Sequence, residues 1–172
     1  MGVDLRLVSP GLEWAAAFLD MNEELRRGGD RQYRASVSAS SFEAFLGDLR
    51  AMEERVVPDG LVPMSIFWLV DGSGRILGEV RFRHYLNEGL MVEGGNIGYH
   101  IRPSERRKGY GTAILQLMLA VARERGYERV LVTCDTDNIP SARIIEGNGG
   151  VLDGYGISDD SGKQVSRYWI DL

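Results

Sequence analysis

Basic side chains and glycines gather in one short stretch, residues 102–112, between an apolar strand-like run and a helix-like run. The triplet at residues 106–108 is wholly basic, and Gly109 and Gly111 leave the backbone uncovered by any Cβ. A helix start presents unpaired N–H groups and the positive end of the aligned peptide dipoles. The pattern predicts a site for a pyrophosphate group at a helix N-terminus, the alternative being a basic turn that only caps the helix.

Two familiar phosphate-binding loops do not fit this stretch. A nucleotide P-loop needs a lysine after its second glycine, whereas Lys108 precedes Gly109 and Thr112 follows Gly111 directly. A dinucleotide fingerprint needs a third glycine, and that position is Ile114.

The spacing Arg106-x-x-Gly109-x-Gly111 resembles the Gln/Arg-x-x-Gly-x-Gly/Ala signature of the GNAT acetyltransferase superfamily. Residues 138–150 resemble that superfamily's Asn-x-x-Ser/Ala helix with its glycine turn, and residues 167–170 resemble its final strand. The run at residues 97–110 is similar to a bacterial branch described only as predicted acetyltransferases. The resemblance covers residues 75–170 and extends to the first seventy residues in layout only.

The resemblance implies acetyl-coenzyme A as cosubstrate and direct acetyl transfer to a primary amine of a small molecule or protein, in a ternary complex. The basic loop would hold the pyrophosphate, and the strand before it would pair with the pantetheine arm and polarise the thioester carbonyl. Asn138 would hydrogen-bond the same arm, although asparagine at such a position is usually a helix N-cap. The cofactor-binding residues that the resemblance implies are Ile101, Arg102, Arg106, Arg107, Lys108, Gly109, Tyr110, Gly111, Thr112 and Asn138.

The residue that would protonate the departing thiolate is not at its usual place. Many members of the superfamily carry a tyrosine at the position of Ile145, which has no proton to donate. We take Tyr99 as the candidate acid, with Tyr110, Tyr155 or water as alternatives.

The base is displaced as well. Many members carry a glutamate near the position of Asn96, which cannot accept the proton, so we take the nearby Glu93 as the candidate base. His100 has a suitable unperturbed pKa of about 6.5, but a lone histidine on a strand is more often packed or solvated. Glu79 is expected to be an ordinary strand charge. An amine that is already neutral, or a water relay, would need none of these groups.

Three other residues invite a functional interpretation. Cys134 is expected to be a small buried hydrophobe and not a nucleophile. Arg81 and Arg83 share one face of a strand and could bind an acidic substrate, but we expect a solvated strand face.

The composition narrows the function classes. A chain of 172 residues is expected to form a single domain, residues 1–172. The formal net charge of −5 argues against general nucleic-acid binding. A single cysteine excludes an internal disulfide and a cysteine zinc cluster, and the two histidines have no metal-site spacing. No run resembles a membrane span or a signal peptide, so we expect a cytoplasmic protein. Because the cysteine and histidine pattern does not suggest a metal site, we expect no resident metal. A homodimer through edge strands or the C-terminal hairpin is an expectation from similar proteins.

Apolar periodicity and turn residues predict the elements that position these groups. Strands are expected at residues 3–8, 64–70, 75–85, 96–102, 129–135, 151–156 and 164–171. Helices are expected at residues 12–27, 41–56, 109–125 and from Asn138 to the glycines at 149–150. This order, β-α-α-β-β-β-α-β-α-β-β, is that of a mixed α/β sheet with helices on both faces, as the resemblance implies.

The same patterns predict which helix faces are buried. The first helix should bury Leu12, Ala15, Ala16 and Leu19, and the second should bury one side that carries two phenylalanines. That side consists of Phe42, Phe45, Leu46 and Leu49.

Two rival functions remain at this stage. A binding module would keep the fold and the coenzyme A site without the chemistry, as the residues at positions 96 and 145 suggest. A nucleotide-binding protein would use the basic loop for phosphate, against which stands the absence of a P-loop lysine.

Overall fold

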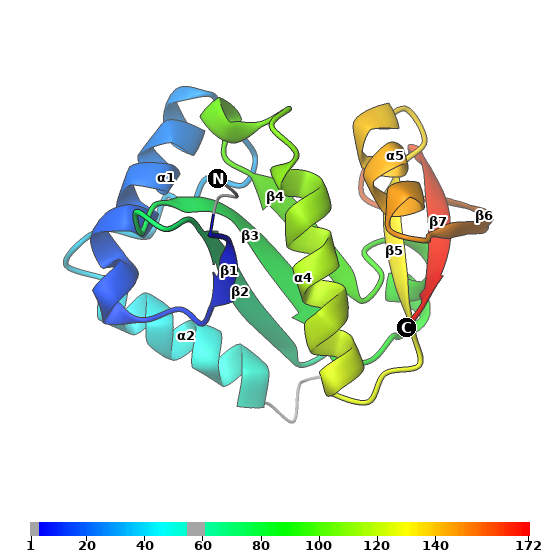
Figure 1. Cartoon of the computed structure of the whole chain (residues 1–172), viewed down its shortest axis with the longest axis horizontal. Helices are drawn as coiled ribbons and strands as arrows, with labels where there is room; N and C mark the ends of the chain where they lie inside the picture. The colour runs from blue at the N-terminus through cyan, green and yellow to red at the C-terminus, as the bar shows by residue number, and fades with distance from the viewer. Residues whose placement is uncertain (1–3, 55–60) are drawn as a thin grey trace.

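The computed structural model describes residues 4–54 and 61–172. A seven-stranded sheet of order β1-β2-β3-β4-β5-β7-β6 crosses the molecule (Figure 1). The neighbours β4 and β5 are parallel, and every other neighbouring pair is antiparallel. The strands are β1 (Arg6–Val8), β2 (Met64–Val70), β3 (Ile76–Arg83), β4 (Ile97–Ile101), β5 (Arg129–Asp135), β6 (Val151–Ile157) and β7 (Gln164–Asp171). The expected mixed α/β fold and its element order are confirmed.

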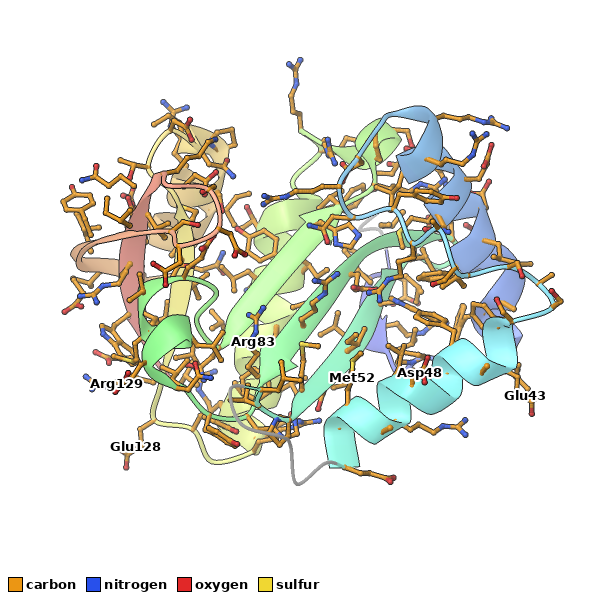
Figure 2. The ribbon with its side chains drawn as sticks, turned by 180° about the vertical axis from the view of Figure 1, so that it is seen from behind. Glu43, Asp48, Met52, Arg83, Glu128 and Arg129 are labelled. Atoms are coloured by element: carbon orange, nitrogen blue, oxygen red, sulfur yellow. The ribbon has the colours of Figure 1, made fainter. Side chains whose placement is uncertain are left out.

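Helices cover both faces of this sheet. Helix α4 (Tyr110–Glu124) packs on the face seen in Figure 1, with α5 (Ile139–Gly147) beside it over the C-terminal strands. Helices α1 (Ala15–Arg27) and α2 (Phe42–Glu54) cover the opposite face, which is toward the viewer in Figure 2. Short helical turns are η1 (Leu12–Trp14), α3 (Glu88–Val92) and η2 (Pro103–Glu105).

The helices bury two separate apolar clusters. One lies under α4 and is built around Phe82, Ile114 and Met118. The other lies under α1 and α2, where aromatic rings pack on Trp68. The prediction for α2 is confirmed, since its four named residues are all buried.

The prediction for α1 was wrong in part, because Ala15 and Leu19 pack partly buried against the cluster under α1 and α2, whereas Leu12 and Ala16 are exposed. Leu12 is 58% exposed, whereas the buried side chains include Phe18, Met21 and Leu25. The chain forms a 3-10 turn before α1 begins, and this shifts the helical face relative to a stripe counted from Leu12. Val3 of the first expected strand and Val56 of the second expected helix lie outside the described residues.

Strands β4 and β5 meet at only one place. Their one paired position is Ile97 with Val132, beyond which the two strands share no further paired residues in the described sheet. The buried Asn96 secures this junction, because its side-chain amide donates to the Arg83 carbonyl at 3.2 Å and accepts from the Leu131 N–H at 2.9 Å. The side chain that stands where a base was sought therefore joins β3 to β5.

The segment before β4 is more ordered than the expected loop. Asn87 caps α3 by accepting a hydrogen bond from the Leu90 N–H, and Gly94 and Gly95 then turn the chain with φ of +103° and +59°. A Cβ on Gly95 would stand 2.4 Å from the Leu131 carbonyl oxygen, so only glycine permits this approach. Glu93 directly precedes this turn, which leads the chain into β4.

Across residues 4–54 and 61–172, no helix has both the length and the apolar character that crossing a bilayer demands.

Candidate active site

A cavity of about 420 Å³ lies where β4 and β5 part. Residues from β3, the end of α3, β4, β5 and the start of α5 line it, together with Arg31 and Gln32 from the segment after α1. Both candidate catalytic residues, Glu93 and Tyr99, line this cavity. Residues far apart in the sequence therefore line one partly open space.

The basic loop presents a row of free backbone donors at the far end of β4. Within the described chain, the N–H groups from Arg107 to Thr112 have no hydrogen-bond acceptor, and no side chain caps α4. Arg107 and Gly109 both adopt left-handed backbone conformations, with φ of +62° and +86°. Alternating backbone conformations of this kind direct consecutive N–H groups into a concavity that suits an anion. The structure therefore has the local form that the sequence predicted for a pyrophosphate site.

Most of the loop's cationic side chains are already paired. Arg106 donates through Nε to the Ile101 carbonyl at 2.9 Å and forms an ion pair with Asp30. Lys108 is paired with Glu105 at 2.9 Å. These contacts fix the loop, so the free binding capacity lies mainly in the backbone.

Arg102 serves the fold and not the expected pantetheine contact. Its side chain is 2% exposed and forms ion pairs with Asp20 and Glu24 on α1. Its backbone N–H donates to the Leu77 carbonyl at 2.9 Å and is therefore unavailable to a ligand. This corrects the expectation that Arg102 extends the strand pairing with a cofactor.

Ile101 and Tyr99 have the opposite orientation. Arg102 donates to β3, and main-chain groups alternate in direction along a strand, so the groups of Ile101 and Tyr99 are directed away from β3. The bond from Arg106 Nε to the Ile101 carbonyl agrees with this orientation. These groups point to the side from which β5 has diverged, where an extended ligand can pair with them.

Tyr99 places a hydroxyl at the start of α5. Its oxygen lies 3.3 Å from Ser141 Oγ, and burial raises the pKa of Tyr99 to about 12. The phenol therefore keeps its proton at neutral pH. Ile145, one turn further along α5, is fully buried in the core, and Tyr155 is 55% exposed on the edge strand β6.

Glu93, Asp160 and His100 are proton acceptors that line the cavity and have no partner for their side-chain acceptor atoms among the described residues. Within the described residues, the Glu93 carboxylate has no hydrogen-bond or ion-pair partner. The Nε2 atom of His100 is buried, likewise without a partner in the described part of the chain. Burial lowers the pKa of His100, which keeps its imidazole neutral. All of these groups can accept a proton, and the carboxylates of Glu93 and Asp160 can also attract an ammonium group.

Two expectations about charged strand residues were wrong. Glu79 is 1% exposed and is held by Arg34, by Arg81 and by the indole N–H of Trp68, so it is not an ordinary strand charge. Although burial opposes it, Arg34 and the neighbouring cations hold the pKa of Glu79 below its usual range. Arg81 and Arg83 line the cavity and do not form a solvated face.

Asn138 and Cys134 also line the cavity. The Asn138 side chain accepts a hydrogen bond from the Ser141 N–H at 3.2 Å, which confirms its N-cap role. Cys134 is buried, and burial raises its pKa, so the expectation of a small buried residue is confirmed.

Comparison with known proteins agrees with this geometry. The model of the family described as "Acetyltransferase (GNAT) domain" matches residues 5–151. The chain belongs to this GNAT family. The mycothiol acetyltransferase of Clavibacter sepedonicus is 28% identical over 161 residues, covering 78% of this chain and 50% of that protein. The chain thus spans about half the length of this relative.

Solved structures of GNAT proteins share the fold. Mycobacterium smegmatis RimJ in complex with CoA-disulfide has a TM-score of 0.74 and 16% identity, covering 99% of this chain and 85% of that one. The ribosomal L7/L12 α-N-protein acetyltransferase RimL in complex with coenzyme A has a TM-score of 0.72 and 15% identity, covering 98% and 94%. At these identities the likeness shows the fold alone.

Proposed function

We propose that this chain transfers an acetyl group from acetyl-coenzyme A to a primary amine, directly and within a ternary complex. The observation that carries the proposal is the row of free N–H groups from Arg107 to Thr112, joined by β4 to a cavity that contains Tyr99 and Glu93. Membership of the GNAT family supports the same chemistry.

The residues present suit acetyl-coenzyme A. The N–H groups after Arg106 would hold the pyrophosphate, and the exposed side chain of Arg107 would add charge beside it. The main chain of Ile101 would pair with the pantetheine arm, and its N–H would polarise the thioester carbonyl. The arm would run along β4 toward the cavity, with Asn138 beside it.

The cavity supplies one group for each proton. Glu93 takes a proton from the ammonium group, after which the amine nitrogen attacks the thioester carbon. A C–N bond forms and the C–S bond breaks, Tyr99 gives its proton to the departing thiolate, and the second proton that the nitrogen loses restores the Tyr99 phenol, while Glu93 releases its proton to solvent. The raised pKa of Tyr99 keeps this proton in place before transfer. Acetyl transfer thus leaves an amide and free coenzyme A.

Ligand-dependent unfolding and thiol release test this function. Acetyl-coenzyme A at a hundred times its dissociation constant stabilises a protein by about 2.7 kcal/mol, and each kcal/mol raises Tm by roughly 2–4 °C for a domain of this size. We expect a rise of several degrees with acetyl-coenzyme A and none with ATP. Thiol release should then appear with an amine and depend on Glu93, as judged by Glu93→Gln.

The outcomes separate the rival functions. Stabilisation by acetyl-coenzyme A without thiol release from any amine in a broad panel would favour a binding module. Stronger stabilisation by ATP would favour a nucleotide-binding protein. No shift with millimolar acetyl-coenzyme A would overturn the proposed cosubstrate.

A further inference from the structure

Arg83, at the end of β3, is a cation without a counter-charge. Its Nη1 atom donates to the carbonyls of Gly94 and Gly95, at 3.0 and 3.3 Å. Within residues 4–54 and 61–172, its Nε and Nη2 atoms have no hydrogen-bond partner, and no carboxylate forms an ion pair with this side chain. Burial, and then the neighbouring Arg81, lowers the pKa of Arg83. Figure 2 shows this residue on the face of the sheet between α3 and α2.

The unpaired side of this guanidinium has a specific geometry. The Nε and Nη2 donors form the parallel fork that fits both oxygens of a carboxylate. The two carbonyl bonds at Nη1 fix the orientation of the group. Because charges removed from water are normally paired, an oriented cation with a free fork indicates an anionic ligand.

The cavity contains an unpaired group of the opposite sign as well. Glu93 directly precedes Gly94, to whose carbonyl Arg83 is bound, yet the carboxylate and the guanidinium form no ion pair. Two opposite charges that lie near one another and are not paired are suited to a ligand that carries both signs.

No described side chain fills the part of the sheet surface formed by Arg81 and Gly98 beside Arg83. Arg81 is tied to Glu79 and to Gln32, at 3.0 Å in each case, so it cannot swing across the space. The residue opposite Arg81 on β4 is Gly98, which contributes no side chain. A Cβ there would stand 3.7 Å from Arg83 Nη1, and any larger side chain would extend over the guanidinium.

An apolar space adjoins the charged one. A second and more open hollow, of about 760 Å³, lies against the same two arginines and is lined by Leu61, Met64 and Leu90, and also by the exposed Glu88. A ligand whose charged groups lie near Arg83 can therefore place an apolar substituent there.

We propose that the acceptor is a small zwitterion, an amine that also carries a carboxylate or another anionic group, with an apolar side chain. The anionic group binds the Nε and Nη2 donors of Arg83, and the amine lies between Glu93 and Tyr99. This inference rests on the proposed function and names its substrate class. The transfer step is unchanged, and the anionic group takes no part in it.

Binding to the coenzyme A-loaded protein tests this assignment. The probes are matched pairs, L-leucine with L-leucinamide, L-phenylalanine with its amide, and O-phosphoethanolamine with ethanolamine. Titration calorimetry is the first measurement, because an acid and its amide differ in amine basicity and turnover alone would mix the two effects. Arg83→Gln removes the fork, and Arg123→Gln is the matched control, an exposed arginine on α4 without a partner among the described residues.

We expect the wild-type protein to bind at least one anionic member about 10- to 100-fold more tightly than its neutral partner. That preference should disappear in Arg83→Gln and persist in Arg123→Gln. The pair with the largest ratio distinguishes a carboxylate from a phosphate. Equal binding of acids and amides, or a preference that survives in Arg83→Gln, overturns the assignment.

Failure of the acceptor class differs from failure of the proposed function. If the protein binds acetyl-coenzyme A and releases thiol with neutral amines as readily as with their acids, only the acceptor class is wrong. If acetyl-coenzyme A itself neither binds nor turns over, the proposed function falls and the acceptor class falls with it.

Discussion

The two ends of β4 are built for binding in opposite ways. At the Ile101 end, most ionic side chains are paired with one another and the backbone N–H groups are left free. At the Ile97 end, the backbone is joined to its neighbours, and the side chains of Arg83 and Glu93 have no ion-pair partner within the described residues. The first arrangement suits a cosubstrate that many proteins share, and the second suits a particular acceptor.

Two arginines make the same contrast, Arg102 fully buried and Arg83 partly exposed. Arg102 has two carboxylates around it and holds α1 to the sheet. Arg83 has only carbonyl partners and lines a cavity. The presence of a counter-charge therefore distinguishes the structural arginine from the arginine that is available for binding.

The largest expected effect is on stability. Arg102→Met should lower the free energy of unfolding by about 3 kcal/mol, because it removes the hydrogen bonds of a fully buried guanidinium to Glu24, to Asp20 and to the Ile76 carbonyl. Urea denaturation with a fitted m-value measures this change.

The companion variant is Arg83→Met. It loses two hydrogen bonds to carbonyls but also removes a partly buried charge that has no carboxylate partner among the described residues, so the free energy of unfolding should change by less than about 1 kcal/mol. Equal destabilisation by both variants would remove the distinction between the two arginines.

Tyr99→Phe should lower kcat by about 100-fold, because the departing thiolate loses its proton donor. The KM for acetyl-coenzyme A should stay close to that of the wild-type protein. Steady-state thiol release measures both constants. Tyr155→Phe, at an exposed position on β6, is the matched control and should leave kcat unchanged. A full rate in Tyr99→Phe would exclude Tyr99 as the proton donor and leave Tyr110 or water.

Gly109→Val should weaken acetyl-coenzyme A binding by about 10-fold, since a left-handed conformation costs an L-residue roughly 1–2 kcal/mol. Gly126→Val imposes the same strain after the other end of α4, where φ is +83°. Titration calorimetry should show weaker binding for the first variant alone. A similar loss of affinity in both would point to general destabilisation of α4.

The smallest expected effect is the alkaline limb of the pH–rate profile. Because the pKa of Tyr99 is raised to about 12, the rate should not fall between pH 8 and 10 through loss of the phenolic proton. The same shift contributes stability that is fully present below about pH 10, the ordinary tyrosine pKa, and is lost as pH rises through about 12. A decline in kcat centred below pH 10 and absent in Tyr99→Phe would contradict this placement.

The sequence predicted the Ile101 end of β4 better than the Ile97 end. A backbone site depends on consecutive residues, so glycine spacing at positions 109 and 111 and the basic loop are visible in one stretch. The cavity draws Arg31, Arg83 and Glu93 from three separate segments, and no local pattern shows that they meet. The signal that was available for α3 was Asn87 followed by an acidic first turn, which is typical of a helix start.

Burial of charge was the other hidden property. Alternation on β3 correctly placed Arg81 and Arg83 on one face, but it cannot tell whether solvent or a cavity lies there. Two partners of Glu79, Arg81 and Trp68, come from β3 and the neighbouring β2. The third, Arg34, lies in the segment after α1, 45 residues away in the chain. Tertiary contacts of this length leave no trace in a local pattern.

The single paired position between Ile97 and Val132 means that the sheet consists of two leaves held along a short seam. A pantetheine arm lying beside Ile101 would supply part of the ladder that the polypeptide omits, so occupancy would add cohesion between the leaves as well as affinity. Amide hydrogen exchange should record this directly. The N–H of Leu131, which is bonded to Asn96 across the seam, should exchange more slowly when acetyl-coenzyme A is present.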